Sequence, residues 1–194
     1  MKLNLGCGPD VRMGYINVDY QDTRDGVVNI DLSQLPWPFG DNSVDEILML
    51  DLLEHFPYKF TEKVLNECWR IMKVGARIEI QVPDFEHCAF AAMGIGQYLC
   101  NVCGAPGKQA VLNDGEECCL QRGTPTFSIK EAAMNRLYGG QNVEGNWHFN
   151  AFTKETLAHK LERAGFKDME LLEKHHQFKN WNFKISATKD TDAW

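Results

Sequence analysis

Short apolar segments that end in a glycine turn or in an acidic residue recur along the first half of the chain. Each has the length and composition of a buried strand, so the glycine or the acid lies at the carboxyl end of that strand. Strands that alternate with helices predict an α/β fold whose sheet is mostly parallel. The predicted strands cover residues 3–5, 15–19, 26–32, 44–50 and 77–82.

One helix is predicted between the last two of these strands. It runs from an N-cap at Thr61 to about Met72, and Gly75 ends it. Apolar residues at helical spacing give this helix one buried face. They are Val64, Leu65, Cys68 and Ile71.

The C-terminal part contains a second helix and two consecutive strands. Thr153 caps the helix and Gly165 ends it, and the strands cover residues 168–173 and 178–189. Two strands in succession predict an antiparallel hairpin. We therefore expect one domain, residues 1–194, with a Rossmann-like, mostly parallel seven-stranded sheet flanked by helices. Residues 84–147 interrupt the pattern, and we expect them to form a lid-like insert.

The composition excludes some classes of protein. Twenty Lys and Arg against 27 Asp and Glu give a net charge of -7, whereas extended nucleic-acid binding needs clustered positive charge. The sequence has no apolar run of the roughly 20 residues that a membrane helix needs and no signal-peptide pattern. We expect a cytoplasmic protein that binds neither an extended nucleic acid nor a membrane, and the oligomeric state stays open.

Residues at the strand ends predict one ligand pocket. Ligands of such sheets bind outside the carboxyl ends of the strands, where the turn 6–8, Asp19, Asp31 and the segment 50–55 all fall. A dinucleotide fingerprint reads G-x-G-x-x-G, but the third glycine is missing here. Asp10 also places a negative charge near the position of a pyrophosphate, which favours a cationic or zwitterionic ligand.

The connection between the first two predicted strands is short. Asp19 follows Gly8 by only eleven residues, which brings the crossover near the lower limit for parallel strands. We therefore expect its helix to have one or two turns at most.

Four stretches, in this order, resemble the class I S-adenosylmethionine-dependent methyltransferases. They are LNLGCG, NVDY, NIDLSQLPWPFGDNSVDEILMLDLLEHF and LNECWRIMKVGARIEIQVPDF. The resemblance covers residues 1–84 and, more weakly, residues 148–187. It implies an enzyme that uses S-adenosylmethionine as its cofactor and releases S-adenosylhomocysteine.

The resemblance also implies cofactor contacts at particular positions. Gly6 and Gly8 let the backbone approach the methionine part of the cofactor, and Asp19 accepts both ribose hydroxyls. Tyr20 packs on adenine, and Asp31 accepts the adenine amino group. The implied cofactor-binding residues are Leu5, Gly6, Cys7, Gly8, Asp19, Tyr20, Asp31, Leu32 and Leu50.

The acceptor is expected to be small or medium-sized, such as a saccharide or another metabolite, and to lie under the insert. A connection this long in a compact domain is usually functional. A base is needed only where the acceptor is a hydroxyl or a protonated amine, and the candidates are His55, Asp84 and His148. His148 is equally explained as a hydrogen-bonded structural histidine, and Glu54 with His55 as the start of a solvated helix.

Cysteines of the insert leave a zinc site as an alternative. Cys100 and Cys103 have the spacing of half a zinc ribbon, but the adjacent Cys118 and Cys119 are awkward tetrahedral ligands. We therefore expect thiols and no metal site, so that the purified protein carries no stoichiometric zinc.

Two other functions are compatible with the sequence. A non-catalytic binding or scaffold protein can use the same fold, with Asp19 and Asp31 as ordinary surface acids. A nicotinamide-dependent oxidoreductase is disfavoured by the missing third glycine. Binding of S-adenosylhomocysteine rather than NAD, together with turnover of an acceptor, separates these functions from methyl transfer.

Overall fold

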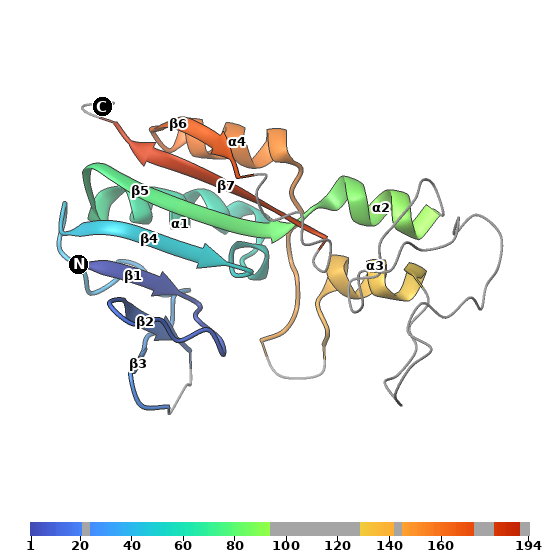
Figure 1. Cartoon of the computed structure of the whole chain (residues 1–194), viewed down its shortest axis with the longest axis horizontal. Coiled ribbons are helices and arrows are strands. Elements are labelled where there is room, and N and C mark those ends of the chain that lie inside the picture. The colour runs from blue at the N-terminus through green and yellow to red at the C-terminus, as the bar shows by residue number, and fades with distance from the viewer. Residues whose placement is uncertain (21–23, 94–128, 142–144, 173–180, 191–194) are drawn as a thin grey trace.

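The computed structural model describes residues 1–20, 24–93, 129–141, 145–172 and 181–190. Its centre is a seven-stranded sheet in the order β3-β2-β1-β4-β5-β7-β6 (Figure 1). β1 to β5 run parallel, whereas β7 is antiparallel to both of its neighbours, as predicted for the terminal hairpin. The strands are β1 (Lys2–Leu5), β2 (Ile16–Asp19), β3 (Val27–Asn29), β4 (Val44–Leu50), β5 (Met72–Pro83), β6 (Phe166–Leu171) and β7 (Asn182–Lys189).

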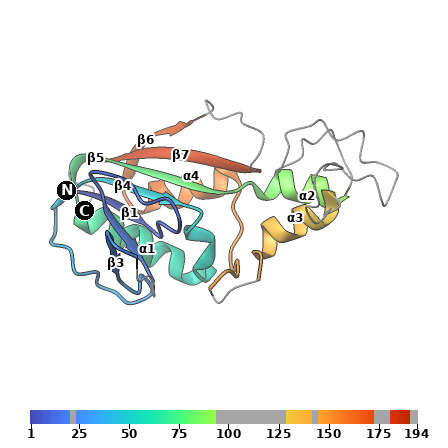
Figure 2. The same cartoon turned by 60° about the horizontal axis from the view of Figure 1, so that its bottom comes forward.

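Four α-helices accompany the sheet in the described ranges. α1 and α4 pack on one face of it, and α2 and α3 lie side by side beyond the carboxyl end of β5 (Figures 1 and 2). None of these helices is long and apolar enough to cross a membrane. The helices are α1 (Tyr58–Ile71), α2 (Phe85–Met93), α3 (Ile129–Tyr138) and α4 (Lys154–Arg163), with a short 3-10 helix η1 (Leu53–His55) after β4.

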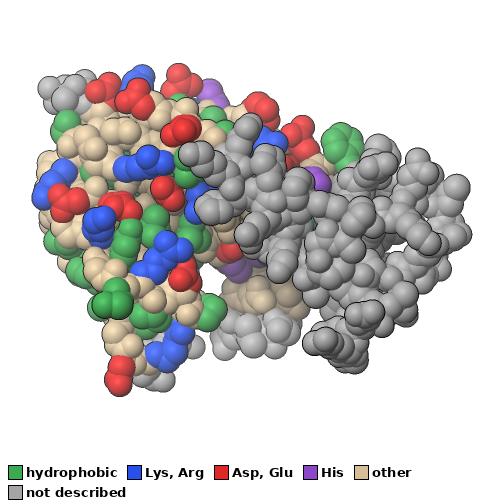
Figure 3. Space-filling view, viewed as in Figure 1, with side chains coloured by type: hydrophobic (Ala, Val, Ile, Leu, Met, Phe, Trp, Pro, Cys, Tyr) green, Lys and Arg blue, Asp and Glu red, His purple; other side chains and the backbone are tan. Residues whose placement is uncertain are grey.

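The two faces of the sheet differ in polarity. Along β5, Ile78 and Ile80 are fully buried in the core beneath α1 and α4. Glu79 points to the opposite face, where it pairs with Arg77 at 3.4 Å and with Lys184 at 3.6 Å. Figure 3 shows acidic and basic side chains interspersed over this face, which no described helix covers. Parallel strands are usually apolar on both faces because helices cover both. Buried apolar and more exposed polar residues alternate along β5 because the described helices pack on one face of this sheet only.

Two buried asparagines support the connection between β1 and β2. The Asn4 amide donates to the carbonyl of Asp10 at 2.7 Å and to Asn17 Oδ1 at 3.0 Å, and Asn17 exchanges two hydrogen bonds with the Arg12 backbone. These bonds satisfy backbone groups that a helix would satisfy internally. The expected helix of one or two turns is wrong, because the ten residues from Gly6 to Tyr15 form turns held by these side chains.

The boundaries of α1 differ from those predicted. The helix begins after Pro57, with no side-chain cap. Thr61 is not its N-cap but a buried residue inside it, whose Oγ1 accepts from the Asn150 amide at 2.8 Å. Gly75 does not end the helix, which stops at Ile71, but lies in the first part of β5 with a φ of 78°. The predicted apolar face is confirmed, since Val64, Leu65, Cys68 and Ile71 are fully buried.

The second predicted helix is confirmed as α4. Thr153 and Thr156 form a reciprocal capping box, with the Thr156 N–H donating to Thr153 Oγ1 at 3.2 Å. Gly165 follows the helix with a φ of 92°. Among the strands, β3 is shorter than the predicted 26–32 and β5 begins earlier than residue 77.

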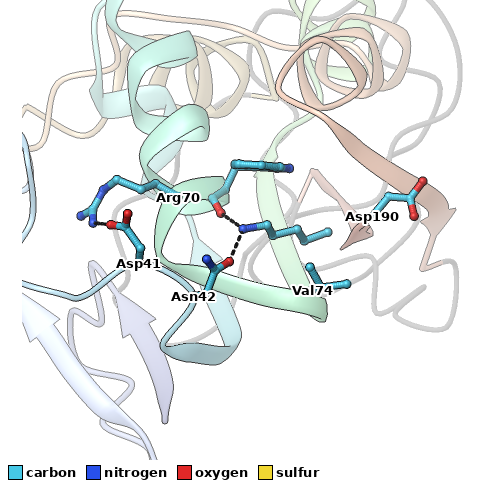
Figure 4. A pocket seen from close by; sticks show the side chains of 7 residues that line it. Asp41, Asn42, Arg70, Val74 and Asp190 are labelled. Atoms are coloured by element: carbon cyan, nitrogen blue, oxygen red, sulfur yellow. Dashed lines mark hydrogen bonds and ion pairs between the residues drawn. The ribbon is translucent and has the colours of Figure 1, made fainter. Parts of the chain in front are cut away.

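Lys189 fastens the last strand to the end of α1. Its Nζ donates to the carbonyls of Trp69 and Met72, each at 2.8 Å, and to Asn42 Oδ1 at 2.7 Å. Burial lowers the pKa of this lysine, which also lies over the Trp69 ring. A surface hollow opens beside it (Figure 4), where Arg70 pairs with Asp41. The hollow lies at the end of β7, opposite to the carboxyl ends of the parallel strands.

Replacing Lys189 by methionine should lower the free energy of unfolding by about 1–3 kcal/mol, because two helix-end carbonyls lose their donor while packing is kept. Thermal and urea unfolding measure this change. The matched control is Lys167→Met on β6, whose side chain is exposed. Equal stabilities of the two variants would show that Lys189 does not fasten the helix end.

Candidate functional site

The turn after β1 touches the segment after β4. Gly6 has a φ of 63°, and a Cβ built there would lie 2.7 Å from the Leu52 side chain. Only glycine therefore lets these two segments approach this closely. β1 and β4 are neighbours whose connections lead to opposite sides of the sheet order, which defines a topological switch point. Ligands of open α/β sheets bind at this point, so the fold brings the predicted pocket residues to one place.

Asp19 ties the glycine turn to the end of β2. Its Oδ2 accepts the Gly8 N–H at 2.6 Å, and its Oδ1 accepts the N–H of Tyr20 at 2.7 Å. Each carboxylate oxygen can accept further hydrogen bonds. Gly8 has a φ of 47°, and a Cβ built on it would meet no described atom within 4 Å. The turn thus offers open backbone beside a fixed carboxylate.

The remaining predicted cofactor residues surround this turn. Tyr20 is exposed at the end of β2, as a surface for stacking requires. Asp31 accepts the N–H and the hydroxyl of Ser33 on one oxygen, Oδ1, and these bonds lower its pKa. The side chains of Leu5, Cys7 and Leu32 are buried, so these residues can contact a ligand only through their backbones. Leu50 is partly exposed.

A second polar group gathers beyond β4. Glu54 and His55 lie on η1, and His148 comes from the segment after α3. The N–H groups of Phe149 and Asn150 both donate to the Glu54 carbonyl, at 2.9 and 3.2 Å, which joins the two segments. The rings of His55 and His148 stand edge to face with centroids 4.8 Å apart, and His148 Nε2 lies 4.0 Å from Glu54 Oε1.

Glu54 is an unusual member of this group because it is 1% exposed. Among the described residues, none donates a hydrogen bond to either of its carboxylate oxygens. Burial raises the pKa of Glu54 well above its ordinary value, and the charge of Asp51 raises it further, although Arg136 acts in the opposite direction. A carboxylate in this place needs a proton or a cation to balance it.

Both histidines are oriented by backbone carbonyls. Nδ1 of His55 lies 3.0 Å from the Trp147 carbonyl, and Nδ1 of His148 lies 2.8 Å from the Arg136 carbonyl. Because a carbonyl only accepts, Nδ1 carries the proton in each neutral ring, and the Gly145 carbonyl is a further partner of the His55 ring. Burial lowers the pKa of both rings, that of His148 to about 4, although carbonyl bonds oppose this at His55. Both are therefore neutral at pH 7.

The third predicted base has other contacts. Asp84 Oδ1 accepts the His87 N–H at 3.2 Å at the start of α2, and Oδ2 lies 3.4 Å from the Lys154 ammonium. The structure thus brings His55 and His148 together, whereas Asp84 caps a helix and forms an ion pair. The role of each as a base stays a prediction.

Asp51 and Glu54 lie in the segment 50–55 that was predicted to fall at the pocket, but neither was among the predicted catalytic or cofactor-binding residues. Asp51 accepts hydrogen bonds from Gln81 and Asn182, and burial raises its pKa. The available signal was two acids within the otherwise apolar stretch 47–56. Cys100, Cys103, Cys118, Cys119, His175 and His176 lie outside the described residues.

Comparisons with known proteins agree with this geometry. Residues 6–80 match the family model described as a methyltransferase domain. No curated protein sequence matches the chain.

Solved structures share the fold at low sequence identity. One is a SAM-dependent methyltransferase from Archaeoglobus fulgidus, with 16% identity, a TM-score of 0.57 and coverage of 97% of this chain and 85% of that one. Another, from Thermotoga maritima, has 18% identity, a TM-score of 0.56 and coverage of 97% and 82%. The 1,6-didemethyltoxoflavin-N1-methyltransferase of Burkholderia thailandensis, with S-adenosylhomocysteine bound, has 16% identity, a TM-score of 0.54 and coverage of 97% and 70%.

Residues 6–80 are thus similar to a methyltransferase domain, and the chain shares its fold with solved S-adenosylmethionine-dependent methyltransferases. These similarities support the predicted family and the predicted cofactor.

Gly8→Ala should keep the protein folded and lower its affinity for S-adenosylhomocysteine at least about tenfold. The added methyl group meets no described protein atom but enters the space where the cofactor backbone contact is predicted. Calorimetry measures the affinity, and thermal unfolding measures the cost of the left-handed φ.

The matched control is Gly14→Ala, which has a φ of 81° and equally open surroundings at the amino end of β2. It should lose a similar amount of stability and keep its affinity. If both variants bind S-adenosylhomocysteine as the wild type does, Gly8 does not line the cofactor site.

Proposed function

We propose that this protein transfers the methyl group of S-adenosylmethionine to a small or medium-sized acceptor, such as a saccharide or another metabolite. The cofactor lies along the ends of β1, β2 and β3, and the acceptor lies beyond β4 under the insert, residues 84–147. The whole chain acts as one domain, in the cytoplasm, without an extended nucleic-acid or membrane partner.

The carboxylate of Asp19 is the observation that carries the cofactor assignment. It lies beside the open glycine turn at the switch point and keeps acceptor capacity on both oxygens after binding two backbone N–H groups. Two vicinal ribose hydroxyls suit such a carboxylate, and the exposed Tyr20 suits the adenine ring. Both bonds from Ser33 fall on Oδ1 of Asp31, and we assign the adenine amino group to its carboxylate, which the Gln34 side chain also approaches.

Aromatic side chains favour an acceptor with a flat or partly apolar face. Tyr138, Trp147 and Phe149 are each about half exposed. Their backbones bond directly to the polar group beyond β4, through His148, His55 and Glu54. Exposed rings next to buried polar groups are typical of small-molecule sites, in which apolar walls hold the ligand and a few polar groups orient it.

The chemistry needs alignment more than acid or base strength. A nucleophile of the acceptor attacks the methyl carbon in line with the carbon–sulfur bond, and the bonding electron pair passes to the sulfonium sulfur. Positioning the two reactants and excluding water supply most of the rate enhancement. Burial lowers the pKa of His55, and the negative charge of Asp19 is one of the weaker influences that oppose this, which supports placing the cofactor acid and the acceptor side near each other.

Asp19→Ala should weaken S-adenosylhomocysteine binding about ten- to a hundredfold, since both ribose hydroxyls lose a charged acceptor. Wild-type protein should show no binding of NAD in the same calorimeter. Asp19→Asn, which keeps the shape of the side chain, should lose affinity as well.

Asp25→Ala serves as the control, because Asp25 is an exposed acid of the neighbouring loop. Unchanged affinity in both folded Asp19 variants would remove Asp19 from the cofactor site. Tight binding of NAD would favour the oxidoreductase alternative.

Tyr138→Ala and Arg136→Gln should reduce acceptor turnover at least about tenfold and leave S-adenosylhomocysteine affinity within about twofold, because they belong to the acceptor side. Turnover is measured by release of S-adenosylhomocysteine against pooled metabolites, followed by the acceptor so found.

Lys167→Met on β6 is the control for turnover. Loss of cofactor affinity in the folded Tyr138 and Arg136 variants would contradict this division between the two sides. Cofactor binding without turnover of any acceptor would favour the non-catalytic alternative.

A further inference from the structure

We propose that Glu54, His55 and His148 form a binding site for one divalent transition-metal cation at the acceptor side of the pocket. One ligand atom of each residue lies within 4.8 Å of the others. Its ligands are not the cysteines that the sequence offered as zinc ligands, and the proposal departs from the expectation of a metal-free protein.

The buried carboxylate is the first argument. Glu54 is 1% exposed, and neither of its oxygens receives a hydrogen bond from a described residue. Burying an unpaired carboxylate is strongly unfavourable, so buried carboxylates are paired or bind cations. Because Oε1 points at His148 Nε2 from 4.0 Å, too far for a hydrogen bond, the two groups leave space for an ion between them.

The orientation of the histidines is the second argument. Metal-binding histidines almost always donate their other ring N–H to a carbonyl or a carboxylate, which fixes the tautomer. His55 and His148 both do this, through Nδ1, to the carbonyls of Trp147 and Arg136. This arrangement leaves Nε2 as the ligand nitrogen of His148, the atom that lies 4.0 Å from Glu54 Oε1.

The local charges leave room for a cation. Glu54 and Asp51 are two buried acids, and Arg136 is the basic side chain whose charge acts on both. A cation bound at Glu54 would allow this buried acid to ionise without an unpaired charge. Asp51 is itself bonded to Gln81 and Asn182, so it balances charge without being needed as a ligand.

The ligand set indicates which metal is preferred. Two imidazoles and one carboxylate suit Mn, Fe, Co, Ni or Zn better than Mg or Ca, which prefer oxygen ligands. Metal–ligand bonds of about 2.1 Å hold two ligand atoms at most ~4.2 Å apart. The ligand atoms here lie up to 4.8 Å apart, so the most distant pair must move closer by at least ~0.6 Å when the metal binds. Three protein ligands leave coordination positions for an oxygen of the acceptor, a role that rests on the proposed function.

The test is metal binding without cofactor or acceptor, so it fails or succeeds independently of methyl transfer. Chelator-treated full-length protein is dialysed against Mn²⁺, Co²⁺, Zn²⁺ or Mg²⁺. We expect one Mn²⁺, Co²⁺ or Zn²⁺ per chain and weaker binding of Mg²⁺. Glu54→Gln and His148→Gln should each lower the affinity for Co²⁺ at least about tenfold.

His159→Gln is the matched control. His159 and Glu162 form an exposed pair on α4 with the same separation of 4.0 Å, and the affinity should stay unchanged when that histidine is replaced. Absence of binding at millimolar metal, or binding that Glu54→Gln and His148→Gln leave intact, would overturn the proposal.

If a variant fails to fold, the absorption and NMR spectra of the metal-loaded wild-type protein still identify the ligands. Co²⁺ bound to imidazole and carboxylate gives d–d absorption without a thiolate charge-transfer band, and bound Mn²⁺ broadens the imidazole resonances of two histidines. A strong thiolate band at one Co²⁺ per chain would assign the metal to the cysteines and refute the site at Glu54.

Discussion

The close contact between Gly6 and Leu52 is the constraint on which the pocket depends. It brings the turn after β1 against the segment after β4, and a Cβ at Gly6 would lie 2.7 Å from Leu52. On one side of this contact lie the glycine turn and Asp19, and on the other lie Asp51, Glu54 and His55. The two segments therefore meet at the switch point of the sheet because Gly6 has no side chain that would collide with the Leu52 side chain.

Polar side chains replace helices in two places of this fold. Asn4 and Asn17 satisfy the backbone of the turns between β1 and β2, where ten residues are too few for the predicted helix. Glu79 and its basic neighbours form the face of the sheet opposite to α1 and α4. In both places side-chain hydrogen bonds or ion pairs satisfy polar groups that no described helix covers.

Much of the fold was predictable because it follows from local periodicity. The apolar spacing of α1, the Thr153 cap of α4 and the alternation of strands with helices all appear in short windows of sequence. The start of α1 was not predictable in this way. Threonine is a common N-cap residue, which is why Thr61 was predicted as the cap. Its burial and the hydrogen bond from Asn150, 89 positions away, place it inside the helix instead. Long-range contacts override such local signals.

The sequence by itself indicated the similarity to methyltransferases and predicted a cofactor position, because the glycine turn and the acids at the strand ends are local features. It also supplied His55 and His148 as separate candidates. Only the tertiary structure decided that these two rings meet over a buried Glu54, since 92 residues separate His55 from the carbonyl that orients it. Burial and hydrogen-bond partners arise from packing. Packing brings one carboxylate and two imidazoles from distant parts of the sequence into a single group.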